Sequence, residues 1–344
     1  MKIGVAYIGV RDPDRIQHDL EFLVSRGYTY ILLPYSEEDF LYYKETMREI
    51  IDITHACGLE IYVSPCGIGR VFDGEAFSEL AGRNPSWAQV NNHDHSMVAS
   101  CINNKDFHEY MRSWVEEVCS TEADSILWDN PHFYSDEGDE NWCCRCEACH
   151  KLFRRKTNHL MPNSLTKSVT EFRISSIYEF LAEMTGLVHT KGKTNAVCFK
   201  LDNDESSINM CEEIAELPTV DELGVKPYWA QGEKLANISK HYREASKKLL
   251  MVCKKFEKEP LVMVKNFSIQ KNNELSVAEA TYAAYNEGIR NILSMAYKGS
   301  YSMSALRSDD ADKVWQIQTE AFAECHDKAI LNEMIDVMKS PKTE

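Results

Sequence analysis

The chain has 344 residues, of which 44% are hydrophobic, and its formal net charge is -16. A chain of this size can bury a large core, either as one α/β barrel or as two ordinary domains. The acidic balance argues against non-specific nucleic-acid binding, which depends on clustered Lys and Arg. No window of 18 consecutive apolar residues occurs, so we expect no membrane span and no nucleic-acid or membrane partner.

Short apolar and β-branched runs alternate with helical patterns along nearly the whole sequence. Eight strands are predicted, at residues 3–10, 28–34, 60–65, 125–129, 195–201, 222–228, 261–267 and 291–297. The clearest helices are predicted at residues 39–56, 106–120, 165–189, 233–250, 277–287 and 311–324. This alternation is typical of successive βα units around a parallel sheet.

Eight such units favour a single (β/α)8 TIM barrel over residues 1–339. A doubly wound sheet is the alternative. It is disfavoured because the turn after the first strand, residues 8–13 (IGVRDP), contains no Gly-x-Gly-x-x-Gly to hold a pyrophosphate. We expect residues 340–344 to form a flexible tail.

A cluster of cysteines follows the fourth predicted strand. Cys144, Cys146 and Cys149 lie within six residues, a spacing that can close around one metal ion. Zinc is the first candidate. Cys101, which precedes a predicted helix, is the preferred fourth ligand. Two alternatives remain for that fourth place: Cys143 and His150.

The alternative interpretation is that several of the 12 cysteines are simply small buried residues. The charged and polar neighbours of the cluster argue against it. A disulfide framework is disfavoured because the sequence starts with a strand-like run and lacks a secretory signal. We therefore expect a reduced, cytoplasmic protein with a structural zinc, since four thiolates leave no position for water. The zinc-binding loop is expected at about residues 130–163, inserted after strand four.

The active site of a (β/α)8 barrel lies at the carboxyl ends of its strands. Asp129 ends the fourth predicted strand, so we expect it in the barrel mouth as a nucleophile or a general acid or base. The alternative is that Asp129 only caps the next loop. Asp202 is the first candidate for a second carboxylate, and His132 is a further catalytic candidate, although a loop histidine is more often structural. Two other carboxylates come into consideration, Asp204 and Glu37.

Aromatic and cationic residues gather at the same predicted strand ends. Flat rings beside polar groups suit sugar rings, and lysines in an acidic protein suit an anion such as a uronate, sulfonate or phosphate. Ordinary core aromatics and solvated lysines are the alternatives. The candidate substrate-binding residues are Tyr35, Arg70, Trp128, Asn130, Lys200, Lys226, Tyr228, Lys265 and Lys298.

The order of these features resembles the glycoside hydrolase family 42 β-galactosidases. The match lies in Cys101, the fourth strand, and residues 144–149 (CRCEAC) leading into residues 152–154 (LFR). It is specific over residues 101–154 and covers the remaining barrel by layout alone. The resemblance implies a structural zinc held by Cys101, Cys144, Cys146 and Cys149.

The catalytic pattern departs from that family. An Asn-Glu pair ends the fourth strand there and a Glu ends the seventh, whereas this chain has Asp129-Asn130 and Lys265-Asn266 at those places. Trp128-Asp129 is similar instead to the fourth-strand end of α-fucosidase-type barrels. That similarity implies Asp129 as the nucleophile.

We therefore expect a glycoside hydrolase-like enzyme that acts on a small oligosaccharide or glycoside, an anionic one included, with Asp129 as the essential carboxylate. Two other functions remain open. One is a Schiff-base lyase or aldolase that uses a strand-end lysine, Lys226 or Lys265. The other is a carbohydrate-binding barrel without catalysis. A homo-oligomer is left open in each case.

Overall fold

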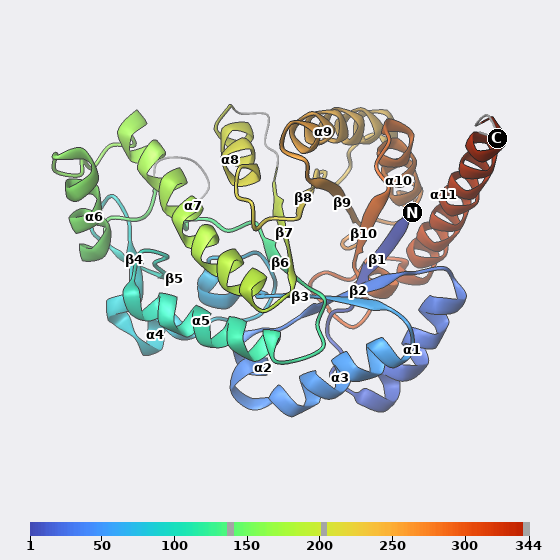
Figure 1. Cartoon of the computed structure of the whole chain (residues 1–344), viewed down its shortest axis with the longest axis horizontal. Helices are drawn as coiled ribbons and strands as arrows, with labels where there is room; N and C mark the ends of the chain where they lie inside the picture. The colour runs from blue at the N-terminus through green and yellow to red at the C-terminus, as the bar shows by residue number, and fades with distance from the viewer. Residues whose placement is uncertain (136–140, 201–204, 340–344) are drawn as a thin grey trace, which may run out of the picture.

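The computed structural model describes residues 1–135, 141–200 and 205–339 (Figure 1). Eight parallel strands close into a barrel in the order β1-β10-β9-β8-β7-β6-β3-β2, which confirms the predicted (β/α)8 barrel. The barrel strands are β1 (Lys2–Ala6), β2 (Tyr30–Pro34), β3 (Glu60–Ser64), β6 (Ser125–Asp129), β7 (Thr194–Phe199), β8 (Glu222–Val225), β9 (Glu259–Lys265) and β10 (Asn291–Met295).

Each predicted strand falls on one barrel strand, but most of them end earlier than predicted. The first was predicted at residues 3–10 and ends at Ala6. The chain leaves the sheet there, and the Tyr7 hydroxyl donates a hydrogen bond to Asp19 Oδ2 at 2.7 Å. The fourth barrel strand, β6, has its predicted bounds. Asp129 is therefore the last residue of its strand, as expected.

Apolar side chains fill the barrel and also the layer between strands and helices. The interior cluster includes Leu32, Leu127, Met263 and Leu293, all buried. A much larger cluster packs the outer faces of the strands against the helices. The strand positions therefore alternate between two apolar layers, which explains why the strands read as continuous apolar runs.

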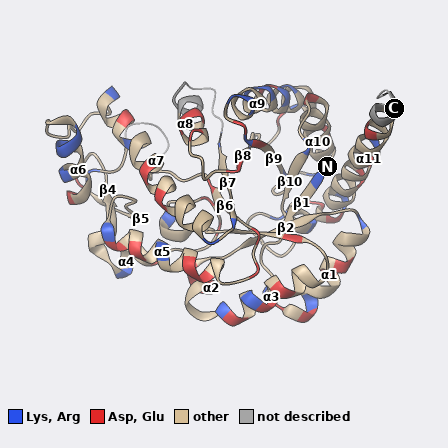
Figure 2. Ribbon diagram, viewed as in Figure 1, with Lys and Arg blue, Asp and Glu red and all other residues tan. Residues whose placement is uncertain are grey.

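The helices cover the outside of the barrel, and acidic and basic residues are interspersed along them (Figure 2). Their bounds are α1 (Pro13–Ser25), α2 (Glu37–Tyr42), α3 (Lys44–Ala56), α4 (Leu80–Arg83), α5 (Lys105–Cys119), α6 (Glu147–Thr157), α7 (Lys167–Thr190), α8 (Glu205–Ala215), α9 (Leu235–Phe256), α10 (Ser276–Glu287) and α11 (Ala311–Lys339). No helix within the described ranges is long and apolar enough to cross a membrane.

Two predicted helices differ from those observed. The helix predicted at residues 39–56 is divided into α2 and α3 at Tyr43, whose backbone angles of φ -124° and ψ 25° are not helical. Helix α2 also begins earlier than predicted, because Ser36 and Asp39 form a capping box. The helix predicted to end at residue 324 continues as α11 to Lys339.

A small antiparallel sheet, which was not predicted, stands beside the barrel. It consists of β4 (Ala88–Val90) and β5 (Ser96–Ser100) and lies near α4 and α6 (Figure 1). The Arg145 backbone N–H donates to the carbonyl of Val90 at 2.8 Å. The loop after β6 is thereby attached to the chain segment that precedes α5.

Candidate functional site

Two buried groups, Asp129 and Lys226, and the partly exposed carboxylate of Asp73 form an ionic triad at the carboxyl end of the barrel. Lys226 Nζ lies 2.5 Å from Asp129 Oδ1 and 2.7 Å from Asp73 Oδ2. Asp129 ends β6 and Lys226 directly follows β8, so rigid strands position both side chains. Asp129 is 7% exposed and Lys226 is 4% exposed. Because both carboxylates contact the same nitrogen, they are also close to each other.

Asp73 comes from the loop after β3, residues 65–79, which we call the β3 loop. Its backbone N–H donates to the carbonyl of Asp129 at 3.0 Å. Asn130 Nδ2 donates to Asp73 Oδ1 at 3.2 Å, and Lys200 Nζ lies 3.2 Å from Asp73 Oδ2. The sequence analysis missed Asp73 because it lies neither at a strand end nor in a recognised motif. Gly67 and Gly69, both with positive φ, are the local signal of a sharply turning loop.

The two carboxyl groups of the triad differ in their pKa. Burial raises the pKa of Asp129; the Lys226 ammonium opposes this shift, and the charge of Asp73 adds to it. Burial also acts to raise the pKa of Asp73, but Lys226, Lys200 and His132 together lower it to about 2. For Lys226, burial acts to lower the pKa, yet the charges of Asp129 and Asp73 raise it overall. Asp73 is therefore the permanent anion, and Asp129 is the carboxyl group better able to hold a proton.

A cavity of about 90 Å³ opens at the triad. Asp73 and Asp129 line it together with apolar side chains that include Leu32, Phe267 and Leu306. Lys226 is absent from this lining, although it contacts both carboxylates. Asp73 and Asp129 thus face the cavity, and Lys226 contacts both of them from behind the residues that line it.

Two aromatic residues predicted to bind substrate are in the core. Tyr35 and Trp128 are 0% exposed. Trp128 Nε1 donates to Asn195 Oδ1 at 3.0 Å, and the Tyr35 carbonyl accepts from Trp114 Nε1 at 3.1 Å. The prediction that they line the mouth is wrong, because their side chains pack in the layer between strands and helices.

The remaining predicted aromatic, Tyr228, packs against the interior cluster of the barrel. Its hydroxyl lies 3.7 Å from Met263 Sδ, and its ring meets the Phe267 ring edge to face. Phe267 lines the cavity at the triad. Tyr228 therefore supports the cavity wall.

The predicted cations do not converge on one anion site. Lys265 Nζ donates to the carbonyl of Trp229 at 2.9 Å, and Lys298 Nζ lies 3.8 Å from Asp19 Oδ1. Arg70 lies over the Phe77 ring, 5.7 Å from its centre. Among the five predicted cations, only Lys200 and Lys226 share a partner, the carboxylate of Asp73. Register and loop geometry separate the strand-end lysines, and carboxylates pair with Lys200, Lys226 and Lys298, so the structure does not gather the cations of the predicted anion-binding mouth.

The other predicted acid/base residues have different surroundings. Glu37 accepts hydrogen bonds from the backbone N–H groups of Gly69 and Glu79, both at 2.9 Å, so it holds the β3 loop and does not pair with Asp129. His132 is partly exposed, and its Nδ1 lies 2.7 Å from the Asn130 carbonyl and 3.7 Å from Asp73. Asp202 and Asp204 lie outside the described residues.

Four cysteines form a second candidate site beside the barrel. The sulfur atoms of Cys101, Cys144, Cys146 and Cys149 all lie within 4.8 Å of one another, and the four residues are buried. Cys101 precedes α5. Cys144 lies in the loop after β6, Cys146 is the N-cap residue of α6, and Cys149 lies in the first turn of that helix. This set contains neither of the alternative fourth ligands, Cys143 and His150.

The surroundings of these sulfur atoms fit bound thiolates. The backbone N–H of Asn103 donates to Cys101 Sγ at 3.4 Å, and Asn103 Nδ2 donates to Cys149 Sγ at 3.3 Å. A tetrahedral set of four sulfur ligands is the donor set of a structural zinc or of iron.

No protein-family model matches the chain, and no curated protein matches it in sequence. Solved structures share its fold. "GH5_18 from Streptomyces cattleya in complex with GlcNAc" has a TM-score of 0.58 at 12% identity, covering 94% of this chain and 80% of that chain. A "GH5-4 broad specificity endoglucanase from an uncultured bacterium" has a TM-score of 0.53 at 12% identity, with coverages of 93% and 94%.

A third similar structure is a D-psicose 3-epimerase with D-tagatose from Clostridium cellulolyticum H10. Its TM-score is 0.51 at 10% identity, covering 95% of this chain and 98% of that chain. Glycoside hydrolase family 5 enzymes and an epimerase are thus all similar to this chain. At such low identities the similarity shows the barrel fold alone.

Proposed function

We propose that the chain is a glycoside hydrolase-like enzyme in which Asp129 and Asp73 are the two catalytic carboxylates. The observation that carries this proposal is the pair of carboxylates at one cavity of the barrel mouth, with their pKa values shifted in opposite directions. Opposite shifts in a neighbouring pair are the usual basis of an acid and an anion acting together. Asp73 takes the place that the sequence analysis gave to Asp202.

The separation of the carboxylates supports a mechanism with retained configuration. Because Asp73 and Asp129 both contact Lys226 Nζ, their contacting oxygens are at most about 5 Å apart, which is shorter than the roughly 6.5–9.5 Å that inverting glycosidases need. In the first step Asp129 protonates the leaving oxygen while Asp73 attacks the anomeric carbon. The glycosidic C–O bond breaks and a glycosyl ester forms. In the second step Asp129 takes a proton from water, whose oxygen attacks the same carbon and releases Asp73.

This assignment differs from the one implied by the α-fucosidase-type resemblance, which makes Asp129 the nucleophile. Asp73 is the better nucleophile here because its low pKa keeps it ionised. Asp129 is the better proton donor because burial raises its pKa. Lys226 acts on both groups as a positioning residue from outside the cavity lining.

The Schiff-base alternative has one supporting observation. Burial lowers the pKa of Lys265, and a lowered pKa is what an amine nucleophile needs. Lys265, however, lines a separate cavity of only about 10 Å³, and Lys226 is held charged by two carboxylates. Borohydride reduction with candidate carbonyl substrates should leave no adduct on either lysine. A trapped adduct on Lys265 would favour the lyase or aldolase instead.

A carbohydrate-binding barrel without catalysis is favoured by Asn130 and Lys265, which stand where the family 42 enzymes have their catalytic glutamates and so leave a second carboxylate missing there. Asp73 supplies that carboxylate from the β3 loop. The basis for the binding-only function is thereby weakened.

The leaving-group dependence of two variants tests the catalytic assignment. Asp129→Ala should slow hydrolysis of p-nitrophenyl glycosides by about 10²–10⁴-fold, the usual contribution of a general acid. It should slow dinitrophenyl glycosides much less, since their leaving group needs no proton. Asp73→Ala should abolish turnover of both substrates. Asp52→Asn, an exposed carboxylate of α3, is the control and should behave as wild type.

The result that would contradict the assignment is the reverse pattern. Dinitrophenyl activity retained in Asp73→Ala but lost in Asp129→Ala would make Asp129 the nucleophile. Wild-type rates in both variants would remove the triad from the mechanism. Circular dichroism of each variant distinguishes lost chemistry from lost folding.

We also propose that the four cysteines hold a structural zinc, as the family 42 resemblance implies. The ion would fix the loop after β6, whose residues 130–134 contact the triad and the β3 loop through Asn130 and His132. Metal analysis of purified protein should give one zinc per chain. Cys149→Ser should lose it, and Cys143→Ala should retain it. Equal zinc in both variants would reject this ligand set.

A further inference from the structure

A second, much larger cavity lies on the other side of the β3 loop. Its volume is about 790 Å³, whereas the cavity at the triad has about 90 Å³. Cavities that enclose small ligands usually measure about 300–1,000 Å³. The cavity at the triad is therefore too small to hold more than the reacting end of a ligand.

The two cavities share one wall. Gly74 and Glu75 line the cavity at the triad, and Ala76 and Phe77, next in the chain, line the larger one. The end of β2 forms a second shared boundary, with Pro34 on the triad side. Ser36 and Glu37 follow on the other side. Residues 74–77 therefore separate the cavity at the triad from the larger cavity, which we call the side groove.

The side groove is lined by residues of α2 and of the segment around α4. These two elements lie on the same side of the barrel (Figure 1). Its floor contains partly buried aromatic rings: Phe40 and Tyr110 meet edge to face at 5.5 Å, and Trp87 lies 6.3 Å from Tyr110. Its rim carries two strongly exposed rings, Phe77 (79% exposed) and Tyr42 (65%). Exposed rings above an aromatic floor provide flat apolar faces of the kind that pack on sugar rings.

The charges in the side groove neutralise one another. Arg83 Nε donates to Glu79 Oε2 at 2.7 Å, and Arg11 pairs with Asp39. Lys44 lies 3.7 Å from Glu117, and Glu37 accepts two backbone N–H groups of the β3 loop. The three cations that line the groove, Arg11, Lys44 and Arg83, are thus each paired with a carboxylate, so the lining offers no surplus positive charge to an anionic ligand. A neutral, hydroxyl-rich ligand suits it best.

We propose that the side groove binds the distal sugar units of a neutral oligosaccharide whose reacting unit enters the cavity at Asp73 and Asp129. This inference rests on the proposed function and extends it from a generic glycoside to an oligosaccharide of at least three units. It replaces the expectation of an anionic substrate. Phe77 and Tyr42 are the residues that pack on the sugar rings.

Direct binding to the Asp129→Asn protein tests the inference without turnover. Isothermal titration calorimetry with cellotetraose, xylotetraose, mannotetraose and, as the anionic comparison, tetragalacturonic acid should show tight binding of a neutral tetrasaccharide. Adding Phe77→Ala or Tyr42→Ala should weaken that binding about 10-fold, which corresponds to about 1.4 kcal/mol of ring contact. Met251→Ala, a change at a 73% exposed residue of α9, is the control and should leave the affinity unchanged.

Three results would overturn the inference: an affinity unaffected by Phe77→Ala and Tyr42→Ala, a preference for tetragalacturonic acid, or no tetrasaccharide binding. A concentration-dependent dimer that Phe77→Ala dissociates would also overturn it, by assigning the groove to a second copy of the chain. Should Asp129→Asn fold poorly, the same titrations on the wild type at low temperature serve instead.

Failure of this inference and of the proposed function are distinguishable. Hydrolysis of aryl glycosides without tetrasaccharide binding rejects the groove and keeps the catalytic assignment. Tetrasaccharide binding that depends on Phe77, without hydrolysis of any glycoside, keeps the groove and rejects the catalysis.

Discussion

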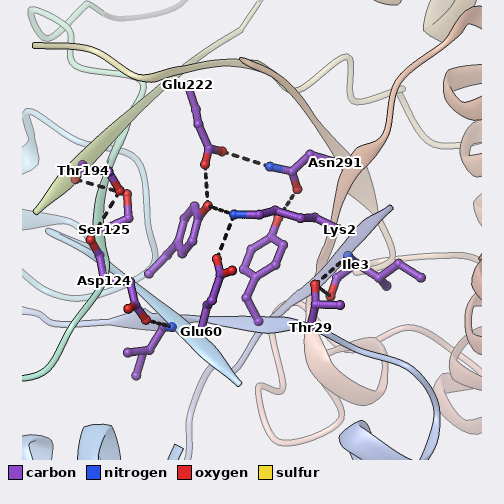
Figure 3. Close-up of polar contacts among 12 residues, drawn as sticks. Lys2, Ile3, Thr29, Glu60, Asp124, Ser125, Thr194, Glu222 and Asn291 are labelled. Carbon is purple, nitrogen blue, oxygen red and sulfur yellow. Dashed lines mark hydrogen bonds and ion pairs between the residues drawn. The ribbon is translucent and has the colours of Figure 1, made fainter. Parts of the chain in front are cut away.

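The carboxyl end of the barrel buries Asp129 against a charged lysine, whereas the amino end buries Glu222 among hydrogen-bond donors (Figure 3). Glu222 Oε2 accepts from Asn291 Nδ2 at 2.9 Å, and Oε1 accepts from the Tyr62 hydroxyl. Lys2 contacts Tyr62 at 3.2 Å and Glu60 at 2.8 Å but makes no direct bond to Glu222. Both ends contain a buried carboxylate, and at the carboxyl end a second one, the partly exposed Asp73, lines the same cavity beside a shared cation.

This difference is the basis on which we assign a structural role to the amino-end network and propose a reactive role for the carboxyl-end one. At the amino end both oxygens of Glu222 are satisfied by protein donors, and barrel residues at that end serve stability. At the carboxyl end Asp73 and Asp129 face a cavity and their pKa values diverge. Burial alone therefore does not indicate the function of a carboxylate. The groups that surround the carboxylate do.

Removing the cation of the triad should have the largest effect. Lys226→Met leaves the buried Asp129 and the partly exposed Asp73 without the cation between them, so we expect glycosidase activity to fall at least about 100-fold. The pKa of Asp73 should rise, because Lys226 is the main group that lowers it, and the acidic limb of kcat/KM against pH should shift upward. Lys200→Met, at an exposed partner of Asp73, should shift that limb less. An unchanged acidic limb in Lys226→Met would show that titration of Asp73 does not control kcat/KM.

Removing the carboxylate of the other end should affect stability alone. Glu222→Ala leaves the Tyr62 hydroxyl and the Asn291 amide without their acceptor, so the free energy of unfolding should fall by about 1–3 kcal/mol. Urea unfolding measures this change, and glycoside hydrolysis by the folded variant should equal that of wild type. A large loss of kcat in folded Glu222→Ala would show that the two ends are coupled.

The two ends should also differ in the pH dependence of stability. The pKa of Asp73 is lowered from 3.8 to about 2. Its stabilising contribution to the free energy of unfolding is therefore present above pH 3.8 and is lost as the pH falls through 2. Burial raises the pKa of Glu222 from 4.5, and the Tyr62 hydrogen bond only partly opposes it. Its contribution is therefore present below pH 4.5 and is lost as the pH rises through the folded value.

Urea unfolding of Asp73→Asn, Glu222→Gln and wild type, from pH 3 to pH 8, measures how the free energy of unfolding of each variant differs from that of wild type at each pH. The difference between wild type and Asp73→Asn should grow as the pH rises from 3 to 5. The difference between wild type and Glu222→Gln should shrink as the pH rises above 4.5. The same sign in both comparisons would contradict the distinction between the two ends.

The smallest expected effect is that of one hydroxyl. Tyr62→Phe removes a donor to Glu222 and keeps the ring, which stacks on Tyr30 at 4.6 Å. The unfolding free energy should fall by about 1 kcal/mol. The pKa of Glu222 should rise further, because that hydrogen bond lowers it. A carboxyl NMR titration of Glu222 in the variant and wild type measures the shift.

Some elements of the site could be predicted from the sequence because they depend on local patterns. Eight apolar runs between helical patterns predicted the barrel, and the run before Asp129 placed this carboxylate at a strand end. The spacing of Cys144, Cys146 and Cys149 predicted their cluster, since a short loop brings such residues together whatever surrounds it. Cys101, far from the other three in sequence, was preferred because it precedes a predicted helix, and the family resemblance supported that choice.

Other elements depend on how loops and strand ends meet, and the sequence pattern carries no signal for that. Trp128 was expected in the mouth but faces the helices, because neighbouring positions of a strand point to opposite sides. Asp73 lies outside any strand, and only the fold of the β3 loop brings it to Lys226. Four strand-end lysines looked alike in sequence, yet register and partners distribute them among separate places.

The sequence by itself thus determined the (β/α)8 barrel, the strand-end position of Asp129 and the three clustered cysteines, because each follows from periodicity or spacing within a few residues. The tertiary structure alone decided that Asp73 meets Asp129 at one cavity, that Lys226 contacts both, and that an aromatic groove lies beyond the β3 loop. Those features join segments far apart in the chain, and their geometry is set by packing that no single segment encodes.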